Sequence, residues 1–154
     1  MTFGMIGSGS WATALTKMLT DNKHIVNWWV RKEETIQHMK EKGFNPNYLS
    51  AAKFDTSLLV MSSDIKEVFK NSDTLVVAVP SAYAAAAFEK LEAKDWEAKK
   101  VISAIKGLLP GKDILLNYYL QQEFDFPLDN YFAVLGPCHA EEVAAEKLSY
   151  LTFS

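Results

Sequence analysis

Short apolar runs alternate with longer amphipathic segments along this chain. An apolar run of strand length is typical of a strand buried in a parallel sheet, and apolar residues at helical spacing are typical of a helix that covers it. The pattern therefore predicts an α/β fold with a doubly wound, mainly parallel sheet. We expect strands at residues 2–6, 25–30, 58–62, 74–79, 101–105 and 131–135. We expect helices at residues 11–20, 33–42, 65–70, 82–91 and 140–147.

Residues at the ends of the predicted elements indicate where helices begin and where loops lie. Asp64 can cap the third helix and Ser81 the fourth. Residues 44–50 contain two Asn and a Pro, which discourage regular structure, so we interpret them as a loop. Residues 148–153 begin another β-like stretch with no turn or covering helix after it. Because no repeat or linker divides the chain, we expect one domain over residues 1–154, truncated at its carboxyl end.

Composition narrows the classes of function. The chain has 154 residues, is 49% hydrophobic and has a net charge of -3, which suits one globular domain with an ordinary core. Its Lys and Arg residues are spread along the chain, so we expect no nucleic-acid partner. No apolar run approaches the roughly 20 residues that cross a bilayer, so we expect no membrane partner. A single cysteine, Cys138, and the lack of a signal-peptide pattern favour the cytoplasm. His24 and His38 have no metal-ligand spacing, so no metal site is predicted.

The strongest motif follows the first predicted strand. The segment Gly7-Ser8-Gly9-Ser10-Trp11-Ala12 lies between an apolar strand and an apolar-periodic helix, the context that a dinucleotide-binding loop requires. Gly7 would make the tight turn, and Gly9 would let the backbone approach a pyrophosphate. Ala12 would allow close packing of helix on strand. The helix N-terminus would supply amide donors and a favourable dipole. A glycine turn that only joins a strand to a helix is the alternative.

The end of the second predicted strand bears on the choice of cofactor. Dinucleotide-binding domains usually place an acidic residue there to hold the adenosine ribose hydroxyls. This chain has Arg31 instead, after Trp28-Trp29-Val30. A guanidinium can pair with a 2′-phosphate or stack on adenine. Arg31 therefore favours NADP(H) over NAD(H), unless it is an ordinary solvated cation.

Three later strand ends would face the same crevice, because ligands of open parallel sheets bind beyond the carboxyl ends of the strands. Pro80 breaks the fourth strand and precedes a helix N-terminus. Lys106 could bind an anionic substrate or polarise a carbonyl that accepts hydride, or it could be a solvated lysine. Residues 136–140 form a tight turn into a helix. Cys138 and His139 are adjacent, and neighbouring side chains point apart, so we expect no covalent catalysis by this pair.

Together these segments resemble the amino-terminal part of bacterial NAD(P)-dependent glycerol-3-phosphate dehydrogenase. The resemblance covers the whole chain, and its specificity lies in the order of six short motifs. They are Gly-Ser-Gly-Ser-Trp-Ala-Thr-Ala-Leu at 7–15, Trp-Trp-Val-Arg at 28–31, Asn-Pro-Asn-Tyr-Leu at 45–49, Val-Ala-Val-Pro-Ser at 77–81, Ser-Ala-Ile-Lys-Gly at 103–107 and Gly-Pro-Cys-His-Ala-Glu-Glu-Val-Ala at 136–144.

The resemblance implies a Rossmann-type domain and hydride transfer between NAD(P)H and dihydroxyacetone phosphate, giving sn-glycerol 3-phosphate for membrane-lipid synthesis. It implies cofactor contacts from Ser10, Trp11, Arg31, Tyr48, Lys106 and Ala140, which join Gly7, Gly9, Ala12 and Pro80, the residues that the loop and strand-end patterns indicate. It implies substrate contacts from Lys106, Gly136 and Cys138. The family usually has Gly in place of Ala12 and Ser or Thr in place of Cys138, and a thiol is the weaker hydrogen-bond partner.

The resemblance also implies what we expect to lie outside this chain. The acid–base lysine of the family belongs to a helical carboxyl-terminal domain, which we expect to be absent here, so we expect little or no turnover from this chain alone. A homodimer is an expectation only for the full-length protein. Two alternatives remain: the NADP-binding domain of another hydroxyacid-type dehydrogenase, or a nucleotide-binding module without catalysis, such as a redox sensor.

Overall fold

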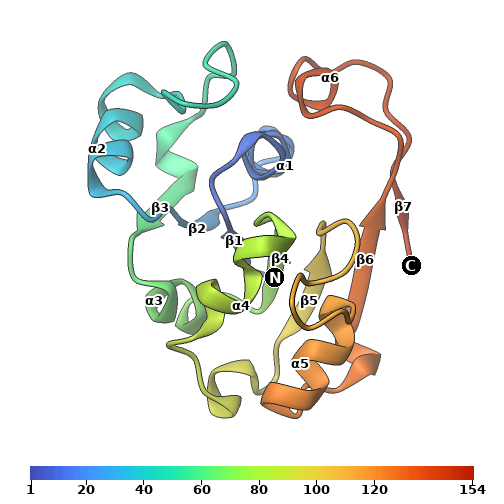
Figure 1. The fold of residues 1–154 in the computed structure, drawn as a ribbon. Coiled ribbons are helices and arrows are strands. Elements are labelled where there is room, and N and C mark those ends of the chain that lie inside the picture. The colour runs from blue at the N-terminus through green and yellow to red at the C-terminus, as the bar shows by residue number, and fades with distance from the viewer.

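The computed structural model describes residues 1–154 and has a seven-stranded sheet with helices on both faces (Figure 1). The strand order is β3-β2-β1-β4-β5-β6-β7. Strands β1 to β6 pair in parallel, and β7 pairs antiparallel with β6 at one edge. The strands are β1 Phe3–Ile6, β2 Val26–Trp29, β3 Leu59–Ser62, β4 Thr74–Val77, β5 Lys100–Ser103, β6 Tyr131–Leu135 and β7 Thr152–Phe153. This doubly wound order confirms the predicted fold class.

Helices α1 to α5 lie in the connections between successive parallel strands, α6 lies between β6 and the antiparallel β7, and together they cover both faces of the sheet. Their bounds are α1 Ser10–Asp21, α2 Glu33–Lys42, α3 Ile65–Lys70, α4 Ser81–Phe88, α5 Leu116–Phe124 and α6 Ala140–Ala144. Short 3-10 turns span Thr56–Leu58, Ala93–Trp96 and Leu128–Asn130. Helices α1 and α2 pack on one face, and α3, α4 and α5 pack on the other. None of the helices is both long enough and apolar enough to cross a membrane.

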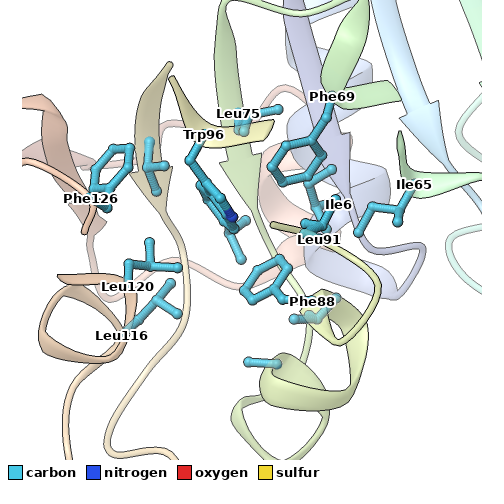
Figure 2. Close-up of a cluster of buried hydrophobic side chains, with 14 of the residues drawn as sticks. Ile6, Ile65, Phe69, Leu75, Phe88, Leu91, Trp96, Leu116, Leu120 and Phe126 are labelled. Carbon is cyan, nitrogen blue, oxygen red and sulfur yellow. The ribbon is translucent and has the colours of Figure 1, made fainter. Parts of the chain in front are cut away.

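Each face of the sheet has its own core because adjacent strand residues point to opposite faces. On β2, Trp28 belongs to the core under α1 and α2, whereas Trp29 belongs to the core under α3, α4 and α5. The second core is centred on Trp96, whose ring makes edge contacts with Phe69 and Phe88 at 4.8 and 5.1 Å between ring centroids (Figure 2). These two packed faces hold the strand ends in fixed positions.

Two details differ from the predicted elements, and one capping residue agrees with them. Helix α5 lies in a stretch for which the sequence pattern led us to predict no element, although Leu116, Tyr119 and Leu120 are buried at helical spacing. The N-cap of α4 is Pro80 and not Ser81, which is the first helical residue and makes no capping hydrogen bond. Asp64 does cap α3, as predicted, by accepting a hydrogen bond from the Lys66 amide at 2.9 Å.

Candidate functional site

A cleft of about 1010 Å³ opens over the carboxyl ends of β1, β2, β3 and β4. It lies where the chain reverses direction across the sheet, because β1 is flanked by β2 on one side and β4 on the other. Ligands of open α/β sheets bind at such a switch point. The lining residues are Gly7, Ser8, Gly9, Trp29, Val30, Arg31, Lys32, Thr35, Asn47, Tyr48, Ser63, Asp64, Ile65, Val79, Pro80, Tyr83, Ala86, Ala87, Glu89 and Lys90.

The glycine loop forms one wall of this cleft, and its two glycines differ in what requires them. Gly7 has a φ of +120°, and a Cβ there would lie 2.7 Å from the Ala78 carbonyl oxygen. The fold itself therefore excludes a side chain at Gly7. A Cβ on Gly9 would meet no atom of the chain within 4 Å. The space above Gly9 is open toward the cleft, as the approach of a phosphate group requires.

Hydrogen-bond donors gather at the same wall. The N–H groups of Ser8 and Gly9 donate to no atom of the chain. Gly9 is the N-cap of the 12-residue helix α1, and no side chain caps this helix. Uncapped amides at the start of a helix, together with its dipole, favour an anion. The loop therefore has the donors and the open space that a cofactor diphosphate needs.

Two cations that line the cleft follow directly after β2. Arg31 is exposed and forms no ion pair within the chain. Lys32, which sequence reasoning missed, also lines the cleft and lies 3.8 Å from Glu34 in a largely exposed pair. Such a pair is weak, because solvent screens it. The nearby carboxylate of Glu33 is engaged by the Ser63 hydroxyl. The part of the cleft that Arg31 and Lys32 line can therefore accept an anionic group.

Apolar and aromatic residues complete the cleft. Pro80 and Tyr48 line it, and both are residues that the sequence reasoning assigned to the cofactor site. Tyr83 on α4 also lines it and is 59% exposed, a residue that sequence reasoning missed. The sequence does contain a hint of this role: Tyr83 is a single aromatic residue next to a run of alanines, and its ring is not part of the core. A ring in this position can cover a flat ligand group.

The other assigned cofactor residues lie at or beyond the rim. Ser10 and Trp11 begin α1 directly after the glycine loop, and both are half-buried. Ala12 is fully buried in the core between α1 and the sheet. Ala140 begins α6, which lies beside α1 (Figure 1). None of these four residues lines the cleft itself.

Lys106 lies apart from the cleft. It follows β5, its side chain is exposed, and it is not among the lining residues. On the neighbouring strand β6, burial raises the pKa of the Tyr131 phenol, and a hydrogen bond with Ser103 acts in the opposite direction. The Tyr131 phenol therefore stays protonated at neutral pH. The strand end thus presents one cation to solvent.

The turn at residues 136–138 contacts a later part of the chain. The Cys138 thiol donates to the Tyr150 carbonyl oxygen at 3.3 Å, and its sulfur accepts from the Tyr150 amide at 3.1 Å. A Cβ on Gly136 would collide with the same carbonyl oxygen. Gly136 is therefore required for close packing of this turn, and the Cys138 thiol is directed to backbone atoms.

Comparisons with known proteins agree with this geometry. A match to the family described as the N-terminus of NAD-dependent glycerol-3-phosphate dehydrogenase covers residues 2–154. The chain belongs to this glycerol-3-phosphate dehydrogenase family. A relative from Agathobacter rectalis, named glycerol-3-phosphate dehydrogenase for NAD(P)+, is 34% identical over 91% of this chain and 41% of its own length. The Bacillus subtilis protein of the same name is 35% identical over 97% of this chain and 44% of its own length.

Solved structures of glycerol-3-phosphate dehydrogenases have the same fold as this chain. The Saccharomyces cerevisiae enzyme superposes with a TM-score of 0.87 at 25% identity, over 100% of this chain and 47% of that one. The Coxiella burnetii enzyme superposes with a TM-score of 0.86 at 24% identity, over 99% of this chain and 46% of that one. The chain therefore spans less than half the length of these relatives, and its match is to their N-terminal domain. The family resemblance that the sequence motifs indicated is confirmed.

Proposed function

We propose that residues 1–154 form a dinucleotide-binding domain that holds NADPH for the reduction of dihydroxyacetone phosphate to sn-glycerol 3-phosphate. One observation carries the proposal: a single cleft is lined by Gly9, whose backbone amide has no partner in the chain, and by the cations Arg31 and Lys32. A diphosphate suits the amides, and a 2′-phosphate suits the cations. The reduced nicotinamide supplies the hydride when it is bound.

The preference for NADPH over NADH rests on the strand end after β2. A carboxylate there would hold the ribose hydroxyls of NADH and repel a 2′-phosphate. Arg31 lacks an internal partner and lies beside Lys32, so the two cations can share one phosphate group. Guanidinium groups bind phosphate with paired hydrogen bonds, whereas lysine acts as a point charge. We infer that Arg31 makes the main contact and that Lys32 reinforces it.

The substrate end of the proposal rests on Lys106 and the turn at Gly136. A lysine at a strand end can neutralise the phosphate of dihydroxyacetone phosphate or polarise its carbonyl. Lys106 has no internal ion-pair partner, so its charge is available. The Cys138 thiol already bonds to Tyr150, so we assign Cys138 a contact through its backbone. Ser10, Trp11 and Ala140 would contact the cofactor from the rim.

Titration of the chain with NADPH and NADH by calorimetry tests the proposed function. The unsubstituted chain should bind NADPH more tightly than NADH. Replacing both cations, Arg31→Ala with Lys32→Ala, should weaken NADPH binding about 100-fold, because two charge-assisted contacts are lost. NADH binding should change by less than about threefold, since NADH carries no 2′-phosphate.

A matched control is available on the adjacent helix. Lys40 is an exposed cation on α2 outside the cleft, so Lys40→Ala should leave both affinities unchanged. A preference for NADH in the unsubstituted chain would contradict the role of the two cations. Failure to bind either dinucleotide would contradict the whole assignment.

A further inference from the structure

Three consecutive carbonyl oxygens of the glycine loop, those of residues 7–9, each accept a hydrogen bond from a side chain. The donors are Trp28 Nε1, Asn45 Nδ2 and Thr13 Oγ1, at 2.6, 3.1 and 2.7 Å respectively. They come from three separate parts of the chain: strand β2, the loop after α2, and helix α1. We call these three residues the loop brace.

The brace is buried and internally connected. Trp28, Asn45 and Thr13 are each 0% exposed. Asn45 Nδ2 also donates to Thr13 Oγ1 at 2.9 Å, and Asn45 Oδ1 accepts from the Asn47 amide at 3.0 Å. Buried hydrogen bonds of this kind are strong in their low-dielectric surroundings, and a partner left unpaired there is costly. The brace therefore holds the loop in one conformation.

Because the peptide unit is planar, a fixed carbonyl group also fixes the direction of the neighbouring N–H group. In a trans peptide the C=O of one residue and the N–H of the next point in opposite directions. Holding the Gly7 carbonyl therefore fixes the Ser8 N–H, and holding the Ser8 carbonyl fixes the Gly9 N–H. Holding the Gly9 carbonyl fixes the Ser10 N–H in the same way. The N–H groups of Ser8 and Gly9 have no partner in the chain, so they are free to donate to a ligand.

We propose that the loop brace is a positioning device for the diphosphate of the cofactor. Its three side chains engage the carbonyl dipoles of the loop, so that the loop presents N–H groups and not C=O groups to the cleft. A rotated peptide would place a carbonyl oxygen against a phosphate oxygen, and the two would repel. Groups that are oriented before binding lose less entropy on binding. This inference rests on the proposed function. The three residues act on the cofactor only by holding the glycine loop in place.

A purely structural role for the same side chains makes a different prediction. If the Thr13 hydroxyl only stabilised the fold, its loss would affect every ligand of the cleft alike. Thr16 provides the matched comparison, because it lies on the same helix, is also 0% exposed, and has a hydroxyl without any hydrogen-bond partner. Thr13→Val and Thr16→Val make the same chemical change, but only the first removes a hydroxyl of the brace.

The experiment compares two probes by calorimetric titration. NADPH contains the diphosphate, whereas adenosine 2′-monophosphate carries only the phosphate that would face Arg31 and Lys32. Thr13→Val should weaken NADPH binding about tenfold, the effect of one lost hydrogen bond of about 1.4 kcal/mol. It should leave the affinity for adenosine 2′-monophosphate unchanged. Thr13→Ser should restore NADPH binding, and Thr16→Val should affect neither probe.

A second variant protects the test against misfolding of the first. Trp28→Phe removes the indole N–H but keeps an aromatic ring in the core, and it should show the same selective loss of NADPH affinity. Unchanged NADPH binding by both Thr13→Val and Trp28→Phe would overturn the brace alone. An equal loss of both probes would also overturn it. Failure of the unsubstituted chain to bind NADPH would overturn the proposed function together with the brace.

Discussion

The two halves of the carboxyl edge of the sheet differ in how they are held. Over β1 and β2, the glycine loop is fixed by side chains from three elements and faces an open cleft. Over β5 and β6, Lys106 is exposed and the neighbouring Leu108 and Leu135 are 51% and 50% exposed. The chain thus fixes its proposed cofactor end with side chains from three elements, whereas at its proposed substrate end the Lys106 side chain is exposed. In the second half, the turn at Gly136 and Cys138 is held through its packing on Tyr150.

The largest effect should come from the first half. Gly7→Ala places a Cβ 2.7 Å from the Ala78 carbonyl oxygen at a φ of +120°, so the loop must move. NADPH binding should fall by about 100-fold or more, and the free energy of unfolding should fall by about 2 kcal/mol. Gly111→Ala is the control, because Gly111 has a φ of +78° but no atom near its Cβ position. Calorimetry and thermal unfolding would measure both, and a Gly7→Ala protein with normal NADPH affinity would remove the contrast between the halves.

An intermediate effect is expected at the exposed half. Lys106→Ala should weaken binding of dihydroxyacetone phosphate to the NADP-loaded chain about tenfold, because one charge-assisted contact to phosphate is lost. NADPH affinity should change by less than about threefold. Lys112→Ala is the matched control, since Lys112 lies in the same loop and pairs with Glu123 at 3.4 Å. Titration with dihydroxyacetone phosphate, observed by nuclear magnetic resonance, would measure both affinities. Equal losses from the two substitutions would mean that Lys106 acts only through its general positive charge.

The smallest effect is expected at Cys138. Cys138→Ala removes two weak sulfur hydrogen bonds to the Tyr150 backbone, so the midpoint of thermal unfolding should fall by about 2 °C. NADPH affinity should not change, because this turn does not line the cleft. Cys138→Ser should retain most of the stability. A large loss of NADPH affinity in Cys138→Ala would show that the two halves of the carboxyl edge are coupled and would contradict their independence.

The strands were predictable because their hydrophobic pattern is local. All six predicted strands are present, and α2 has the predicted bounds of residues 33–42. Helix α5 was missed although its buried residues have helical spacing, because polar and aromatic neighbours such as Tyr118 and Gln121 obscure the apolar face. Element ends shifted by a few residues where capping and pairing decide the boundary, as at Pro80.

The site was predictable only where its chemistry is contiguous in the sequence. The glycine loop and Arg31 stand next to recognisable strand ends, and the structure brings them into one cleft. Asn45 was hidden in a segment interpreted as a loop, because its contacts with Ser8 and Thr13 join residues that are far apart in the chain. Such tertiary hydrogen bonds leave no periodic signal in a single sequence.

The central place of β1 in the sheet also bears on the kinetics of folding. Strand β1 precedes all its partners in the chain, yet it pairs with β4, whose Thr74 lies opposite Phe3. Contacts between residues this distant in sequence form slowly, because a long loop must close first. During synthesis, one edge of β1 stays unpaired until β4 has emerged, and an unpaired strand edge can associate with other chains. We therefore expect the yield of folded protein to rise when the chain is expressed with chaperones or at lower temperature, even if the native state is stable.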